Sequence, residues 1–209
     1  MLESKNIYIL GYSGHAYVVL DAALSNHYLV KGYFDNSKVE NNPYQINYIG
    51  EETKVDIKSI LKSDYIFPAI GSNSIRKKLI HFIESKHLNQ IALIDKSAHV
   101  SLKAILGKST LVGPRAIINS MVEIGKGCII NSGTIIEHEC KIGDFTHIAP
   151  GSVLTGNVTV GNEVFIGANA TIIPGVTIGD NAVVGAGAVV IKNIASNETW
   201  VGNPARRII

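Results

Sequence analysis

The C-terminal half of the chain carries a large aliphatic residue at every sixth position. Stepping by six from Ile94 to Val190, all seventeen residues are Ile, Leu or Val, and we call these residues the hexad positions. Four places after each of them comes a small or β-branched residue, such as Ala116 or Cys128. One large and one small inward side chain per six residues is typical of short flat strands joined by turns, three of which close a triangular coil. The pattern therefore predicts an all-β parallel β-helix over residues 94–209, with roughly five to six stacked coils.

Glycine or asparagine directly follows many of the hexad positions. Both residue types tolerate a positive φ angle, which a tight corner requires. We therefore expect these residues to form the corners of the coils. They are Gly107, Gly113, Gly125, Gly143, Gly161, Gly167, Gly179 and Gly185, together with Asn119 and Asn131.

The N-terminal half alternates predicted strands and helices. Residues 5–10 predict a buried strand, and residues 16–24 predict a helix with one apolar face. Between them lies the turn Gly11-Tyr12-Ser13-Gly14-His15. A glycine-containing turn between a strand and a helix points backbone N–H groups at a phosphate. The turn has the spacing Gly-x-x-Gly, which is shorter than the full dinucleotide motif Gly-x-Gly-x-x-Gly.

Polar residues follow the next predicted strands. The strand over 29–34 ends in Asp35 and Asn36, about twenty residues after the turn, where an acid commonly contacts a ribose or a base edge. These elements make an α/β half-Rossmann domain over residues 1–93, which suits one nucleotide better than a dinucleotide. The remaining predicted elements are a strand over 64–70 that ends in Gly71-Ser72-Asn73, a helix over 74–86 and a short strand over 91–94.

Composition narrows the class of protein. The 209 residues carry a formal net charge of only +2, so no basic stripe indicates a nucleic-acid partner. No apolar run reaches the length of a membrane span, and the polar start Met1–Asn6 argues against a secretory signal. Cys128 and Cys140 cannot staple a domain of this size and occupy small inward places, so we expect packing roles and a cytoplasmic location. The histidines and cysteines show no metal-ligand spacing, so no metal is expected.

Several motifs taken together resemble one family. They are the turn at 11–15, the loop Ala69-Ile70-Gly71-Ser72-Asn73 with Arg76-Lys77-Lys78, the hexads, Ile136-Glu137-His138-Glu139-Cys140, and Val201-Gly202-Asn203-Pro204-Ala205. Over essentially its whole length, the chain resembles the bacterial sugar O-acyltransferase (sialic acid O-acetyltransferase-like) family, and within it the bacillosamine-pathway nucleotide-4-amino-sugar N-acetyltransferases. The resemblance implies a homotrimer of left-handed β-helices. It implies acetyl-CoA bound between subunits, and a UDP- or dTDP-linked 4-amino-4,6-dideoxy sugar bound at the N-terminal domain.

The resemblance also implies roles for individual residues. His138 corresponds to a general base that assists direct attack of the sugar C4 amine on the thioester, and Glu139 corresponds to the acid that orients it. Asn131 and His147 correspond to polar residues beside the acetyl group and the amine. The family often has a second acid where Asn36 stands, so the choice between UDP and dTDP stays open. The implied nucleotide-sugar contacts are Gly11, Ser13, Gly14, His15, Asp35, Asn36, Gly71, Ser72 and Asn73.

The CoA site is expected in the later coils and the tail. CoA phosphates need cations, and the last three basic residues of the chain lie in this region. A backbone N–H near Gly156 would stabilise the oxyanion of the tetrahedral intermediate. The residues assigned to CoA are His147, Gly156, Gly167, Lys192, Arg206 and Arg207.

Each site residue also has an ordinary structural interpretation. His138 lies two places after a hexad position and would then be a solvated surface residue, while Asn131 would be a left-handed corner. His147, five places after a hexad position, is expected at a corner. His15 would cap the helix that follows it, and the tail cations would be ordinary surface charges.

The function has alternatives as well. One is O-acetylation of sialic acid or of another sugar hydroxyl. Another is a non-catalytic β-helix, either a scaffold or a metal-binding trimer. A trimer is expected because Ile117, Ile129 and Ile135 would otherwise lie on the surface of a monomer.

Overall fold

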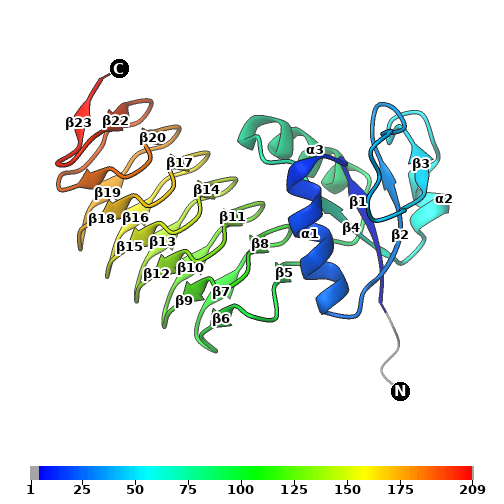
Figure 1. Cartoon of the computed structure of the whole chain (residues 1–209), viewed down its shortest axis with the longest axis horizontal. Helices are drawn as coiled ribbons and strands as arrows, with labels where there is room; N and C mark the ends of the chain where they lie inside the picture. Colours follow the sequence, from blue (N-terminus) through cyan, green and yellow to red (C-terminus); the bar gives the residue numbers. More distant parts are fainter. Residues whose placement is uncertain (1–4, 209) are drawn as a thin grey trace. The chain divides into compact units, whose positions relative to one another are not determined.

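The computed structural model describes residues 5–208, which form two compact units (Figure 1). The first unit ends at Lys96 and the second begins at Ser97. The polar residues 1–4, which argued against a secretory signal, lie outside the described residues. Within residues 5–208, no helix combines the length and the apolar character that a membrane crossing requires.

The first unit is a parallel sheet with helices packed against it, as expected. Its strands lie in the order β3-β2-β1-β4. The chain leaves β1 toward β2 on one side and later returns to β4 on the other, so the carboxyl ends of β1 and β4 flank a topological switch point. The elements are β1 (Asn6–Leu10), α1 (Gly14–Ser25), β2 (Leu29–Phe34), β3 (Tyr48–Gly50), α2 (Ile57–Leu61), β4 (Tyr65–Pro68), α3 (Asn73–Ser85) and β5 (Leu93–Ile94).

Two short elements of this unit escaped prediction. β3 has three residues, all of them half-buried, and α2 has five residues. Neither is long enough to display a hydrophobic period. β3 nevertheless matters for the pocket described below, because it pairs with β2 as a fourth strand and is followed by Glu52, which lines that pocket.

The second unit is a left-handed parallel β-helix; the hexads predicted the β-helix, and the family resemblance implied its hand. Strands pair in parallel with strands eighteen residues away, for example Ile130 with Ile148. The hexad positions from Val112 to Val190 are at most 4% exposed, so they form the core of the prism. The strands are β6 (His99–Val100), β7 (Ile105–Leu106), β8 (Leu111–Val112), β9 (Ile117–Ile118), β10 (Glu123–Ile124), β11 (Ile129–Ile130), β12 (Ile135–Ile136), β13 (Lys141–Ile142), β14 (His147–Ile148), β15 (Val153–Leu154), β16 (Thr159–Val160), β17 (Phe165–Ile166), β18 (Thr171–Ile172), β19 (Thr177–Ile178), β20 (Val183–Val184), β21 (Val189–Val190), β22 (Thr199–Val201) and β23 (Arg206–Arg207).

The strands of the second unit form three faces. The first face contains β8, β11, β14, β17, β20, β22 and β23, and the last two strands pair antiparallel at its end. The second face contains β6, β9, β12, β15, β18 and β21, and the third contains β7, β10, β13, β16 and β19. Successive strands along the chain therefore visit the first, second and third face in turn.

Positive φ angles occur at a different place in the repeat from the expected one. They lie three places after the hexad positions, as at Glu139 (φ 62°) and Asn157 (φ 57°), and none of the ten glycines and asparagines expected at corners has a positive φ. The glycines directly after hexad positions are explained instead by the close stacking of coils, which leaves no room for a side chain. A Cβ on Gly143, for example, would lie 2.5 Å from the carbonyl carbon of Gly161 in the next coil.

Small inward residues fill the corners of the prism. Cys128 and Cys140 are fully buried, and burial raises the pKa of the Cys140 thiol, which fits the packing role expected for both. The expectation of an exposed Ile129 was wrong, because this residue is only 1% exposed and lies in register between Leu111 and His147 of the flanking strands.

Candidate active site

His138 and Glu139 form a hydrogen-bonded pair at a corner of the β-helix. The chain turns there from β12 to β13, and the positive φ of Glu139 makes the bend. His138 Nδ1 lies 3.1 Å from a carboxylate oxygen of Glu139, and the two side chains are 60% and 64% exposed. Neighbouring coils fix the backbone, since Glu139 N–H donates to Ser120 O and His138 O accepts from Asn157 N–H. A rigid corner thus presents an oriented imidazole to solvent.

The imidazole of His138 rests against Gly156 of the next coil. A Cβ built on Gly156 would lie 2.6 Å from His138 Cε1 and 2.8 Å from Nε2, so the ring fits only because this residue has no side chain. The N–H of Gly156 has no hydrogen-bond partner among residues 5–208. Gly156, whose N–H the oxyanion hypothesis uses, therefore lies next to the imidazole.

His147 lies on a strand rather than at a corner, contrary to expectation. It is the first residue of β14, paired in register with Ile129 and Phe165, because the outward residue of each strand precedes its hexad position. Its ring makes an edge contact with Phe165, with 5.1 Å between centroids, and His147 Nε2 lies 3.3 Å from the amide nitrogen of Asn131. Asn131 is not in the left-handed region; its side-chain oxygen accepts from Ser132 N–H.

The two groups of site residues lie on different sides of one prism. His138 stands at the corner between the second and third faces, whereas His147 lies on the first face. In a triangular coil, the corner between two faces is opposite the remaining face. A single chain therefore does not bring His138 together with His147 and Asn131.

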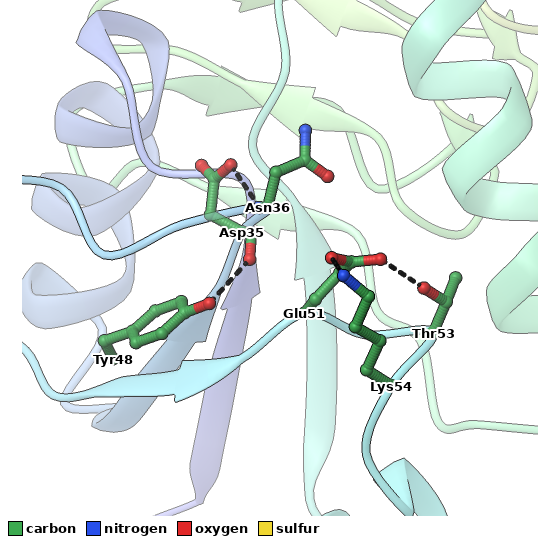
Figure 2. Close-up of polar contacts among 6 residues, drawn as sticks. All are labelled: Asp35, Asn36, Tyr48, Glu51, Thr53 and Lys54. Atoms are coloured by element: carbon green, nitrogen blue, oxygen red, sulfur yellow. Dashed lines mark hydrogen bonds and ion pairs between the residues drawn. The ribbon is translucent and has the colours of Figure 1, made fainter.

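The expected nucleotide site lies at the carboxyl edge of the sheet in the first unit. Gly11 has a φ of 91°, and a Cβ there would press on the Ile70 side chain, so glycine is required. Asp35 holds the turn in place, since its carboxylate accepts from the N–H groups of Tyr12 (2.8 Å) and Asn36 (2.7 Å). Figure 2 shows Asp35 and Asn36 at the end of β2, with Asn36 exposed.

His15 and the loop 71–73 face each other across the switch point. A Cβ on Gly71 would lie 4.0 Å from the Cβ of His15. Burial, together with the charge of Arg76, lowers the pKa of His15 to about 4, so its ring is neutral at physiological pH. Ser13 precedes α1 and makes no side-chain cap, and Gly14 has open space around it. The N–H of Ala16 donates to Ser13 O, whereas the N–H groups of Gly14 and His15 have no partner within residues 5–208 and can receive an anion.

Arg76 is a site residue that sequence reasoning did not assign. The residue is 1% exposed, and its guanidinium donates to the carbonyls of Ile70 and Gly71 and to the side-chain oxygen of Asn73, at 2.8–3.1 Å. It therefore fixes the loop that faces His15. The basic run Arg76-Lys77-Lys78 gave no indication in the sequence that Arg76 is buried.

The tail cations differ in their surroundings. Arg207 forms an ion pair with Glu198 at 3.1 Å, and Arg206 donates to the Ala205 carbonyl. Lys192 is exposed, and Gly167 is a close-packed glycine whose Cβ would meet the backbone of the next coil. Within residues 5–208, no three His, Cys, Asp or Glu side chains gather as metal ligands would.

Sequence families match both halves of the chain. The PglD N-terminal domain matches residues 6–83. The hexapeptide repeat of succinyl-transferase matches residues 103–138 and 157–192, and the six-repeat bacterial transferase hexapeptide matches residues 121–156.

Solved structures match the whole chain. Perosamine N-acetyltransferase from Caulobacter crescentus, with one histidine changed to asparagine and in complex with CoA and GDP-perosamine, is 30% identical; the match covers 100% of this chain and 98% of that chain, with a TM-score of 0.92. The acetyltransferase domain of PglB from Neisseria gonorrhoeae FA1090, in complex with acetyl coenzyme A, is 28% identical; coverage is 98% and 100%, with a TM-score of 0.88.

Proposed function

The chain belongs to the bacillosamine-type family of hexapeptide-repeat N-acetyltransferases with a PglD N-terminal domain, and we propose that it acetylates the amino group of a nucleotide-linked amino sugar. Acetyl-CoA is the acyl donor of this acyltransferase. The observation that carries the proposal is the His138–Glu139 pair beside the N–H of Gly156. The resemblance of the whole chain to amino-sugar N-acetyltransferases favours an amine acceptor over a hydroxyl.

The imidazole of His138 supplies the base that the reaction needs. A thioester is already activated, whereas an amine attacks only when it has lost its extra proton. Glu139 engages Nδ1, which leaves Nε2 to accept the amine proton. The carboxylate also stabilises the imidazolium that results, and the unperturbed pKa of a histidine suits proton transfer near neutral pH. No covalent acyl-enzyme is needed, so the acetyl group passes directly from sulfur to nitrogen.

The developing oxyanion requires a donor on the other side of the thioester carbonyl. The N–H of Gly156 is close to the imidazole and has no partner among residues 5–208. We assign it to the oxyanion. Such a donor typically contributes about 10² to 10³ in rate.

A trimer would join the two halves of the catalytic site. His147 and Asn131 lie opposite the His138 corner of their own prism, so they would complete the site of a neighbouring subunit. Apolar side chains on the first and second faces support such contacts, because Ile117, Phe165 and Val183 are 36–38% exposed in the single chain. Burying them would favour association at roughly 25 cal/mol per Å².

The nucleotide-sugar is assigned to the first unit. The N-terminus of α1 would receive the diphosphate, with Ser13, Gly14 and neutral His15 beside it. Asp35 keeps further lone pairs for ribose hydroxyls, and Arg76 holds the loop 71–73 in place. The sequence left UDP and dTDP as carriers, and a related enzyme was crystallised with a GDP-linked sugar.

For CoA, Lys192 and Arg206 remain the proposed phosphate contacts. Arg207 can contribute as well, although it also forms an ion pair with Glu198.

The proposal is tested by steady-state kinetics of His138→Ala. We expect kcat to fall by roughly 10² to 10⁴ with modest changes in KM, because only the transition state needs the base. Raising the pH should restore part of the loss, since more of the amine is then unprotonated. His87→Ala, an exposed histidine of the first unit, is the control and should keep wild-type kcat. Wild-type kcat in His138→Ala at neutral pH would contradict the proposal.

A further inference from the structure

A pocket opens at the carboxyl edge of the sheet, on the side of α3. Apolar residues from the ends of β2 and β4 and from α3 form its walls, among them Phe34, Ile70 and Leu79. Asp35, Asn36 and Glu52 supply its polar groups. Apolar walls with a few polar groups suit a planar heterocycle whose edge forms hydrogen bonds.

The carboxylates at and beside the pocket differ in the hydrogen bonds that they can still accept. Both carboxylate oxygens of Asp35 already accept backbone N–H groups. Glu51 does not line the pocket, and Lys54 and Thr53 occupy its carboxylate, both at 2.7 Å (Figure 2). Glu52, the next residue, is half-buried and has no hydrogen bond or ion pair with any residue of the described range 5–208. Of the two carboxylates that line this pocket, Glu52 is therefore the one whose oxygens both lack a protein donor within residues 5–208.

On the basis of the proposed function, we infer that this pocket binds the base of the nucleotide-sugar and that Glu52 selects guanine. The order of the parts of the ligand matches the order of the strands β1, β2 and β3 in the sheet. The phosphates are assigned to the turn after β1, the ribose to Asp35 after β2, and the base to Glu52 after β3. A carboxylate only accepts hydrogen bonds, and it can accept two in parallel. Guanine presents two adjacent donors, N1–H and the N2 amino group.

The other bases do not match a carboxylate in this way. Uracil and thymine offer one donor, N3–H, between two carbonyl oxygens that a carboxylate repels. Adenine offers an amino group beside a ring nitrogen that is itself an acceptor. A carboxylate at the pocket thus attracts the donors of guanine and repels the acceptor atoms of uracil, thymine and adenine. Specificity commonly combines such attraction of the correct ligand with repulsion of the wrong ones. Neither the Gly-x-x-Gly turn nor Asp35 makes this distinction.

The test is calorimetric titration of the full-length protein with GDP, inosine diphosphate, UDP and dTDP. Inosine diphosphate is the matched control for GDP, because it differs from GDP only in lacking the N2 amino group. We expect GDP to bind at least tenfold more tightly than the other three. Glu52→Gln should weaken GDP binding by roughly 10- to 100-fold, since a charge-assisted pair is lost, and should abolish the difference between GDP and inosine diphosphate. Glu51→Gln, whose carboxylate faces Lys54, should leave the GDP preference intact.

Each outcome separates this inference from the proposed function. Equal binding of GDP and UDP, or equal effects of Glu52→Gln and Glu51→Gln, would overturn the guanine assignment while leaving sugar acetylation standing. GDP binding that depends on Glu52 in an enzyme that fails to acetylate amino sugars would support the base assignment and overturn the function. An absence of binding by all four nucleotides would overturn both.

Discussion

At the scale of single residues, the orientation of His138 depends on a residue that bears no side chain. Gly156 has an ordinary backbone conformation, so alanine is allowed there, but its Cβ would lie 2.6–2.8 Å from atoms of the imidazole. We predict that Gly156→Ala turns the ring and lowers kcat by about 10-fold or more, because small misplacements of catalytic groups are costly. Thermal unfolding should change little, since the ring is exposed and can move.

A double variant separates positioning from a general packing effect. In a His138→Ala background, the added methyl group meets no imidazole, so Gly156→Ala should cause little further loss of kcat. Additive losses in the double variant would show that Gly156 acts independently of the ring, for example through its N–H alone.

His15 gives a stability prediction with a defined sign. Its pKa of about 4 in the folded protein lies below the ordinary value of 6.5, because burial and Arg76 disfavour the charged form. Above pH 6.5 the ring is neutral in both states. As the pH falls from 6.5 to 4, the unfolded chain takes up a proton that the folded chain refuses, so stability is lost across this window. We expect His15→Gln to lose less stability than wild type between these pH values in urea titrations. Parallel pH curves for the two proteins would contradict the assigned cause.

At the scale of elements, the β-helix uses glycine for two different reasons. Gly133 has a φ of 66° and open space around its Cβ position, whereas Gly143 has an ordinary φ and a coil stacked against it. Alanine at Gly133 should cost roughly 1–2 kcal/mol for the left-handed conformation. Alanine at Gly143 should cost more, about 3 kcal/mol, because two coils must separate. Urea unfolding at one protein concentration measures both, and the reverse order would contradict this division.

The sequence predicted the two folds of the chain but not the contacts that depend on residues far apart. The hexads predicted the β-helix because an inward aliphatic residue recurs at every strand, and the turn after β1 predicted the α/β unit. Gly143 was wrongly expected to adopt a positive φ, because the requirement for glycine there comes from the backbone of Gly161, eighteen positions away. The burial of Arg76 follows from the loop that wraps around its guanidinium, and the place of Glu52 at the pocket follows from the folded sheet; neither leaves a hydrophobic period in the sequence.

At the scale of the whole molecule, the proposed catalytic site would need residues from more than one chain. The His138 corner and the His147 face lie on opposite sides of the same prism. If each site combines His138 and Glu139 of one subunit with Asn131 and His147 of its neighbour, a cyclic trimer has three equivalent sites, one at each subunit junction. Removal of either group inactivates every site in a trimer of identical chains.

Mixed trimers test this arrangement directly. His138→Ala and the double variant Asn131→Ala/His147→Ala should each be strongly impaired when expressed alone. When the two are co-expressed in equal amounts, random assembly places an intact His138 beside an intact Asn131 and His147 at about a quarter of the junctions. Activity per junction should therefore rise to roughly a quarter of wild type, with the mass of a trimer by light scattering. Co-expression of His138→Ala with Glu139→Ala is the control: both lesions lie on the same side of the junction, so an intact pair never arises and the less impaired variant sets the upper limit. Failure of the first mixture to exceed its parents, with trimers present, would contradict a site shared between His138 of one subunit and Asn131 and His147 of its neighbour.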